Sequence, residues 1–221
     1  MPKIIPLRGL IVQHHLIISD DGVDLIDGGF FRGIARIKNA LRRQGKTLSD
    51  VWSILLTHGH LDHTINVARL QKITNCQVYA PLADRDHVNG CHRYRGWSKI
   101  AGWLETIGRV LFRFEKPNID HWLEPGERIH GLEVIALPGH TIGHCGFLHD
   151  DTQLLFAGDL FTDHLGKASP PPAILNDDSI MARLSIKKAA KLDLKGVLLN
   201  HARKAEPAKT LLSLVNLADD L

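Results

Sequence analysis

Short apolar runs and amphipathic stretches alternate along the chain in a pattern typical of mixed α and β structure. Apolar runs predict strands over 13–18, 23–26, 51–56, 77–80, 132–137, 153–157 and 196–199. Helical spacing, or a capping residue before it, predicts helices over 30–44, 62–74, 100–112, 178–192 and from 207 onward. This order favours an α+β fold in which two sheets pack together with helices outside them.

Composition narrows the class of protein. The 221 residues suit a single domain, and 44% hydrophobic content is ordinary for a globular chain. The formal charge of +3 is too small, and the basic residues too dispersed, to predict a nucleic-acid partner. No run approaches the ~20 apolar residues of a membrane span, so we expect no membrane association. Three widely spaced cysteines predict no disulfide framework, which favours a cytoplasmic location.

The densest group of histidine and carboxylate side chains lies directly after the apolar run 51–56. There the chain reads His58-Gly59-His60-Leu61-Asp62-His63, with three imidazoles and a carboxylate within six positions. These side chains are natural ligands of zinc and neighbouring divalent metals. On a tight loop, this spacing can offer one ligand pair to each of two metals.

The loop closely resembles the H-x-H-x-D-H signature of the metallo-β-lactamase superfamily. That resemblance implies further ligands in a set order, each after a strand, and the chain supplies them as His140, Asp159 and His201. It also implies an Asp-x-Gly turn upstream, which Asp27 begins. The implied fold is the αββα four-layer sandwich over residues 1–221, with the ligand loops along one edge.

The same resemblance implies how the ligands are shared between two divalent metals, with Zn²⁺ expected and Fe or Mn left open. The first metal is expected at His58, His60 and His140, the second at Asp62, His63 and His201, with Asp159 between them. Physics supports a shared anion, because two dications roughly 3.5 Å apart repel each other. An Asp at 159 favours the glyoxalase II-like and lactonase-like branches over the β-lactam-cleaving enzymes, which generally lack it.

The implied activity is metal-dependent hydrolysis of a small ester, thioester or lactone. A hydroxide bridging the metals, formed from water whose pKa falls to about 7, would attack the carbonyl carbon. Asp62 is expected to orient this hydroxide and carry a proton to the leaving group. Tyr94 is the candidate for an extra oxyanion donor. The alternative is a mononuclear iron persulfide dioxygenase, a class with the same loop motif.

Several positions stay open at this stage. Residues 91–118 are either a segment that caps the site, an ordinary core helix or a contact in a homodimer. His164 is the rival of His201, and Asp27 either orients a ligand histidine or caps its own turn. His144 is expected to order its loop, and Cys145 to be a small core residue. The remaining histidines show no ligand spacing and are interpreted as surface or core residues; they are His14, His15, His87, His92, His121, His130 and His149.

Overall fold

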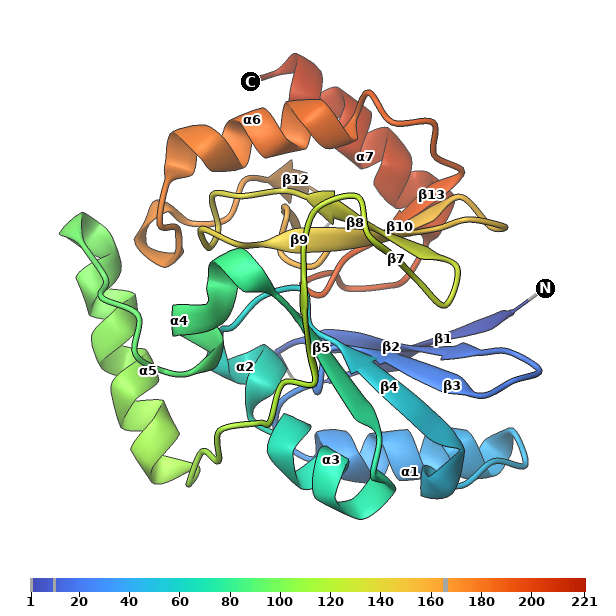
Figure 1. Cartoon of the computed structure of the whole chain (residues 1–221). Helices are drawn as coiled ribbons and strands as arrows, with labels where there is room; N and C mark the ends of the chain where they lie inside the picture. The colour runs from blue at the N-terminus through green and yellow to red at the C-terminus, as the bar shows by residue number, and fades with distance from the viewer. Residues whose placement is uncertain (1, 10, 165–166) are drawn as a thin grey trace.

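Two β-sheets face each other, with helices on both outer sides, in the computed structural model of the chain (Figure 1). Residues 2–9, 11–164 and 167–221 are described, without the side chains of Trp97 and His164. The predicted four-layer αββα sandwich is confirmed. None of the helices in the described ranges is both long and apolar enough to cross a bilayer.

The first sheet combines antiparallel and parallel pairing. Its six strands lie in chain order: β1 (Lys3–Arg8), β2 (Gln13–Ile18), β3 (Val23–Ile26), β4 (Val51–Leu55), β5 (Gln77–Pro81) and β6 (His121–Leu123). The strands β1 to β3 pair antiparallel, and β3 to β6 pair parallel. The carboxyl ends of β3, β4 and β5 therefore lie at the same edge of the sheet.

The second sheet has the order β13-β10-β9-β8-β7. Its strands are β7 (Arg128–Ile129), β8 (Leu132–Ala136), β9 (Cys145–His149), β10 (Leu154–Phe156) and β13 (Gly196–Leu198). Strands β10 and β13 run parallel, so their carboxyl ends also share an edge. The strands β11 (Thr162–His164) and β12 (Lys167–Ser169) pair antiparallel in a separate two-stranded sheet.

The outer layers are helical (Figure 1). Helices α1 (Gly33–Arg43) and α3 (Val67–Thr74) cover the first sheet, and α6 (Ser179–Ala189) and α7 (Pro207–Asp219) cover the second. Near the ligand loops lie α2 (Leu61–Thr64), α4 (Arg85–Val88) and α5 (Lys99–Leu111), and α5 stands at one side of the sandwich. Short 3-10 turns occupy 48–50, 82–84, 96–98 and 173–175.

Three apolar layers hold the sandwich together, as its four-layer architecture requires. The central layer lies between the sheets and contains Phe147 and Phe156. A second packs the first sheet against α1 and α3 through residues such as Ile37 and Leu70. The third packs the second sheet against α6 and α7, with Leu214 at its centre.

The helix predicted over 62–74 is wrong in one respect, because two helices replace it. Helix α2 ends at Thr64 and α3 begins at Val67. Between them, the Asn66 amide donates to the carbonyls of Gly29 (2.8 Å) and Phe30 (2.9 Å). Six strands were not predicted, namely β1, β6, β7, β9, β11 and β12. Among them, β1 contains Pro6 and β9 contains Gly146, both residues that weaken a strand pattern.

Candidate metal centre

Tight turns bring the ligand loops to one edge of the sandwich. His58 and His60 follow β4, and Gly59 between them lies so close to α4 that an added Cβ would be 2.3 Å from the Val88 nitrogen. Gly139, before His140, has a φ of 130°, and a Cβ there would lie 2.0 Å from the Ala182 nitrogen. Only glycine fits either position, so both turns depend on residues beside the ligands.

One carboxylate oxygen, Oδ2 of Asp159, faces four imidazoles. Its distances to Nε2 are 3.2 Å for His201, 3.3 Å for His140, 3.5 Å for His63 and 3.8 Å for His58. Ligand atoms that share a tetrahedral zinc at about 2.1 Å lie roughly 3.4 Å from each other. The spacing around Asp159 is therefore that of atoms able to share metal ions.

Two clusters of candidate ligand atoms have the membership expected from the sequence, and a third, His58, His63 and Asp159, overlaps both. Ring nitrogens of His58, His60 and His140 lie within 4.8 Å of one another, and so do the ligand atoms of Asp62, His63 and His201. In the second group, Asp62 Oδ2 lies 3.4 Å from Nε2 of His201. Asp159 lies between the groups, since it approaches His140 on one side and His201 on the other.

Three of these histidines have one ring nitrogen held by the protein. His63 Nδ1 donates to Asp27 (3.1 Å), and His140 Nδ1 donates to Asn176 Oδ1 (3.1 Å). His58 Nδ1 lies 3.0 Å from the Thr57 hydroxyl. Among the described residues, the opposite Nε2 atoms have no hydrogen-bond partner although they are buried.

Buried polar atoms without partners are costly and uncommon in folded proteins. Four such atoms occur here within the described ranges: Nε2 of His58, His63 and His140, and Oδ1 of Asp159. An imidazole held at Nδ1 and open at Nε2 is the arrangement of a metal-ligating histidine. The residues present therefore fit a pair of divalent cations.

Asp27 orients His63, a candidate ligand, which favours the first of its two expected roles. Its side chain is fully buried and accepts hydrogen bonds from the Thr57 N–H (2.8 Å), the Thr57 hydroxyl (2.9 Å) and the Asn200 amide (2.7 Å), besides His63. It thus joins the loop after β4 to the residue before His201.

His144 orders its own loop, as expected, and also contacts the loop of Asp159. Its Nδ1 donates to the Leu137 carbonyl (2.9 Å), and its Nε2 accepts from the Asp159 N–H (3.0 Å). Burial lowers the pKa of His144 to about 4, so the ring is neutral and can accept that hydrogen bond. Cys145 beside it is a buried core residue.

Charge is distributed unevenly over the centre. Burial, then neighbouring imidazoles, lower the pKa values of His58 and His60 well below the ordinary value. Burial is the largest single influence on His63 and His201 and opposes their charge, but the neighbouring carboxylates, Asp159 and Asp62, together outweigh it. They raise both pKa values, that of His201 to about 10. Any cation that binds beside His63 and His201 must displace their protons.

Asp84 supports the ligand loops and was missed by the sequence analysis. Its buried carboxylate accepts the N–H of Gly59 (2.6 Å) and of Gly143 (3.0 Å), which ties the His58–His63 loop to the loop after His140. Asn176 and Asn200, which hold His140 and Asp27, were missed as well. No local motif marks them, because each acts on a residue distant in sequence.

A cavity of about 450 Å³ opens onto the centre. Asp62, Asp159 and His201 line its polar side, while Leu104 and Phe112, on and just after α5, line its apolar side. We name it the metal-centre cavity.

Tyr94 also lines the metal-centre cavity, but its hydroxyl donates to Glu105 and lies 3.4 Å from His87 Nδ1. The hydroxyl proton of Tyr94, expected to bind an oxyanion, is thus already donated to Glu105.

His87 and His92 belong to a cluster that their spacing in the sequence did not reveal. Their Nε2 atoms lie 2.8 Å and 3.1 Å from the two carboxylate oxygens of Asp177, and their rings stack at 3.6 Å. No spacing in the sequence indicates this cluster, because Asp177 lies 85 or more positions away. His87 also contacts His60 edge to face at 5.4 Å, so this cluster borders the centre.

Strand β2 carries His14 and His15, and β11 ends at His164. His14 and His15 are fully buried, and burial lowers the pKa of each to about 3. The side chain of His164, the rival of His201, lies outside the described part of the structure.

The fold and the site can be compared with those of known proteins. A four-layer sandwich with a histidine–aspartate cluster at its edge defines a metal-binding protein of the metallo-β-lactamase fold. The sequence model of the metallo-β-lactamase superfamily matches residues 8–201, and the chain belongs to that superfamily.

Individual relatives are more distant. The chain is 35% identical to a hydroxyacylglutathione hydrolase of Rhodopseudomonas palustris (strain BisB18) over 136 residues, 60% of this chain and only 42% of the relative. It is 30% identical to the hydroxyacylglutathione hydrolase GloC of Haemophilus influenzae over 181 residues, 76% of each chain. The structure of TTHA1623 in a di-iron-bound form matches with a TM-score of 0.71 and 25% identity, covering both chains completely.

Proposed function

We propose that this protein is a dinuclear metal-dependent hydrolase that cleaves a small ester, thioester or lactone. The observation that carries the proposal is the set of buried Nε2 atoms of His58, His63 and His140, which face Asp159 without hydrogen-bond partners among the described residues. The proposed ligands are those of the two groups, with Asp159 shared. Zn²⁺ is the proposed metal, and the di-iron form of TTHA1623 keeps iron as the competitor to test.

When bound, the two cations supply a Lewis acid and a water of lowered pKa. Asp62 lies at the metal-centre cavity, with Oδ2 3.4 Å from His201. It accepts the proton of the attacking water and returns it to the departing oxygen or sulfur. His58, His63 and His140 keep their orientation through Thr57, Asp27 and Asn176.

Segment 91–118 closes one side of the metal-centre cavity and selects the substrate in this proposal. Leu104, Gly108 and Phe112 present an apolar surface toward the centre, where they would contact an acyl group and exclude water from it. A small molecule is therefore the proposed substrate. The hydroxyacylglutathione hydrolases among the relatives make thioesters the first class to test.

The test combines metal content with turnover. Purified protein loaded with Zn²⁺, Fe²⁺ or Mn²⁺ is assayed against aliphatic thioesters, p-nitrophenyl esters and acyl lactones, while oxygen uptake is recorded with a persulfide. We expect about two metals per chain and chelator-sensitive hydrolysis. One iron per chain with oxygen uptake and no hydrolysis would overturn the proposal in favour of a persulfide dioxygenase.

A further inference from the structure

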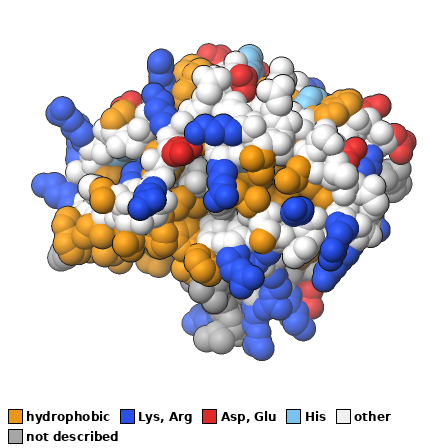
Figure 2. Space-filling view, turned by 90° about the horizontal axis from the view of Figure 1, so that it is seen from below, with side chains coloured by type: hydrophobic (Ala, Val, Ile, Leu, Met, Phe, Trp, Pro, Cys, Tyr) orange, Lys and Arg blue, Asp and Glu red, His pale blue; other side chains and the backbone are white. Residues whose placement is uncertain are grey.

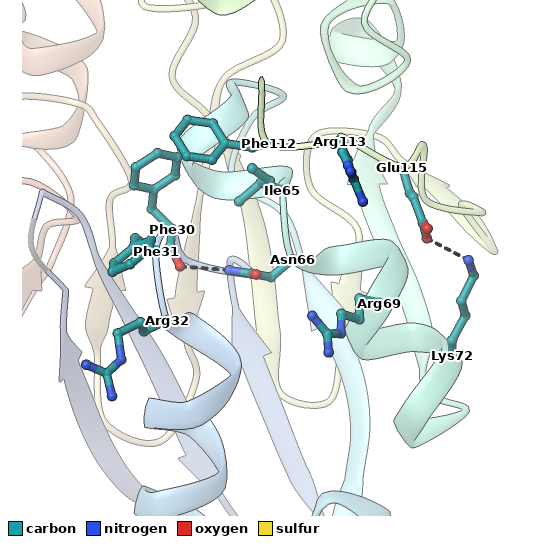
Figure 3. A pocket seen from close by; sticks show the side chains of 10 residues that line it. All are labelled: Phe30, Phe31, Arg32, Ile65, Asn66, Arg69, Lys72, Phe112, Arg113 and Glu115. Carbon is teal, nitrogen blue, oxygen red and sulfur yellow. Dashed lines mark hydrogen bonds and ion pairs between the residues drawn. The ribbon is translucent and has the colours of Figure 1, made fainter. Parts of the chain in front are cut away.

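A second cavity, of about 490 Å³, lies beside the metal-centre cavity, between the start of α1, α3 and the segment after α5 (Figure 3). Phe30 and Phe112 line both cavities, and their rings meet edge to face with centroids 5.2 Å apart. The second cavity thus begins at the apolar wall of the first. A single elongated molecule can reach both.

The second cavity is strongly basic, and we name it the basic cavity after its cations, Arg32, Arg69, Lys72 and Arg113. Glu115 is its single acidic lining residue, and it pairs with Lys72 at 2.6 Å (Figure 3). Within the described ranges, the guanidinium groups of the three arginines make no hydrogen bond or ion pair. Glu115, whose pKa is lowered by Lys72 and also by Arg69, is outnumbered by the cations, so the cavity has an excess of positive charge.

The surface around the basic cavity is also positively charged. The face of the molecule over α1 and α3 carries many Lys and Arg side chains and few acidic ones, next to an apolar area over α5 (Figure 2). Such a field attracts anions and raises their local concentration. The two neighbouring surfaces, one apolar and one cationic, match a ligand with an apolar part and an anionic part.

The loop that carries the basic cavity's aromatic wall is held in shape by the protein. The Asn66 amide binds the carbonyls of Gly29 and Phe30, and Arg32 has a left-handed φ of 59° at the start of α1. Phe31, between these residues, is 57% exposed and lines the basic cavity. Binding there would require little ordering of the backbone, which favours affinity.

We propose that the basic cavity binds the anionic part of the leaving group of the substrate, a thiol carrier with two or more phosphate or carboxylate charges. The acyl chain lies against Leu104 and Phe112 in the metal-centre cavity. This proposal rests on the proposed hydrolase function. Water adds its oxygen to the acyl carbon, the C–S bond breaks, and the thiol sulfur leaves with a proton. Guanidinium groups suit such anions because they form paired hydrogen bonds with phosphate or carboxylate.

The test uses one acyl chain on three thiols: coenzyme A with phosphates, glutathione with carboxylates, and uncharged N-acetylcysteamine. The variants are Arg69→Glu and Arg113→Glu, and the matched control is Arg183→Glu on α6, all at exposed positions. We expect either cavity variant to lower kcat/KM for a charged thioester about tenfold or more, mainly through KM. The uncharged thioester and the control should stay unchanged.

Comparison of the two charged thioesters shows which anion the basic cavity takes, because the preferred one loses more. Equal losses on all three thioesters, or no loss on the charged ones, would overturn the proposal.

A binding experiment separates this proposal from the hydrolase proposal. Calorimetric titration with free coenzyme A and free glutathione needs no turnover. If no thioester is hydrolysed but a free thiol binds wild type and not Arg69→Glu, anion binding by the basic cavity is retained, while the hydrolase proposal and with it the leaving-group role are overturned. If hydrolysis occurs but both thiols bind wild type and variants equally, the hydrolase stands and the basic cavity proposal fails.

Discussion

The carboxylate of Glu105, in the middle of α5, accepts a 2.6 Å hydrogen bond from the backbone N–H of Leu61, the residue before Asp62. One turn further along, Arg109 donates to the carbonyls of Gly59 (3.2 Å) and His87 (3.0 Å). Helix α5 therefore holds the ligand loop at two points. The segment that lines the metal-centre cavity and the loop that carries four candidate ligands are mechanically joined.

Glu105→Ala should weaken metal binding, because Leu61 loses its acceptor and the start of α2 is no longer held. We expect metal affinity to fall about tenfold or more, as for other supports of ligand residues. Competition with a chromophoric chelator measures it. Glu105→Gln retains an acceptor for Leu61 and should recover most of the affinity; wild-type affinity in the Ala variant would refute the coupling.

Asp159→Ala should lower the metal content below the expected value of about two per chain and abolish turnover, because the shared anion between the cations is lost. The fold should persist, since Asp159 lies in a loop outside the three apolar layers. Metal analysis, hydrolysis assays and circular dichroism together check this. Hydrolysis at the wild-type rate would exclude the bridging role.

Asp84→Ala should destabilise the fold, because the N–H groups of Gly59 and Gly143 would stay buried without an acceptor. Leaving two such groups unpaired costs about 3 kcal/mol of unfolding free energy. Urea unfolding measures the change. Asp86→Ala, at an exposed position two residues away, is the matched control and should change stability by less than about 0.5 kcal/mol. Similar losses in both variants would contradict the assigned role of Asp84.

Acid should destabilise the protein through His15, whose pKa burial lowers to about 3 in the folded state. The unfolded chain takes up the proton near pH 6.5 and the folded chain does not, so stability is full above that pH and falls below it, down to about pH 3. The loss from one such histidine is about 2 kcal/mol at pH 5.

His15→Leu should remove this contribution, because the ring contacts Phe156 edge to face at 5.5 Å and neither ring nitrogen has a hydrogen-bond partner among the described residues. Urea midpoints at pH 7 and pH 5 measure the effect. The variant should lose less stability than wild type between the two values; an equal loss would show that His15 is not the cause.

Much of the architecture was predictable from local sequence. Apolar runs located β2, β3, β4, β5, β8, β10 and β13, and helical spacing located α1, α5, α6 and α7. The motif 58–63 and its resemblance to a known family predicted seven residues that the fold brings together. These predictions succeed because the periodicity of a strand or a helix depends only on neighbouring residues, and because each ligand loop follows a strand.

Only the tertiary structure decided which distant side chains support and surround the centre. Asp84 acts on Gly143, Asn176 on His140, and Asp177 on His92, each pair separated by 36 or more positions. The coupling of α5 to the ligand loop and the gathering of three arginines in the basic cavity arise in the same way. Hydrogen bonds and shared cavities between remote segments leave no period in the sequence, since their geometry depends on how the two sheets and their loops pack.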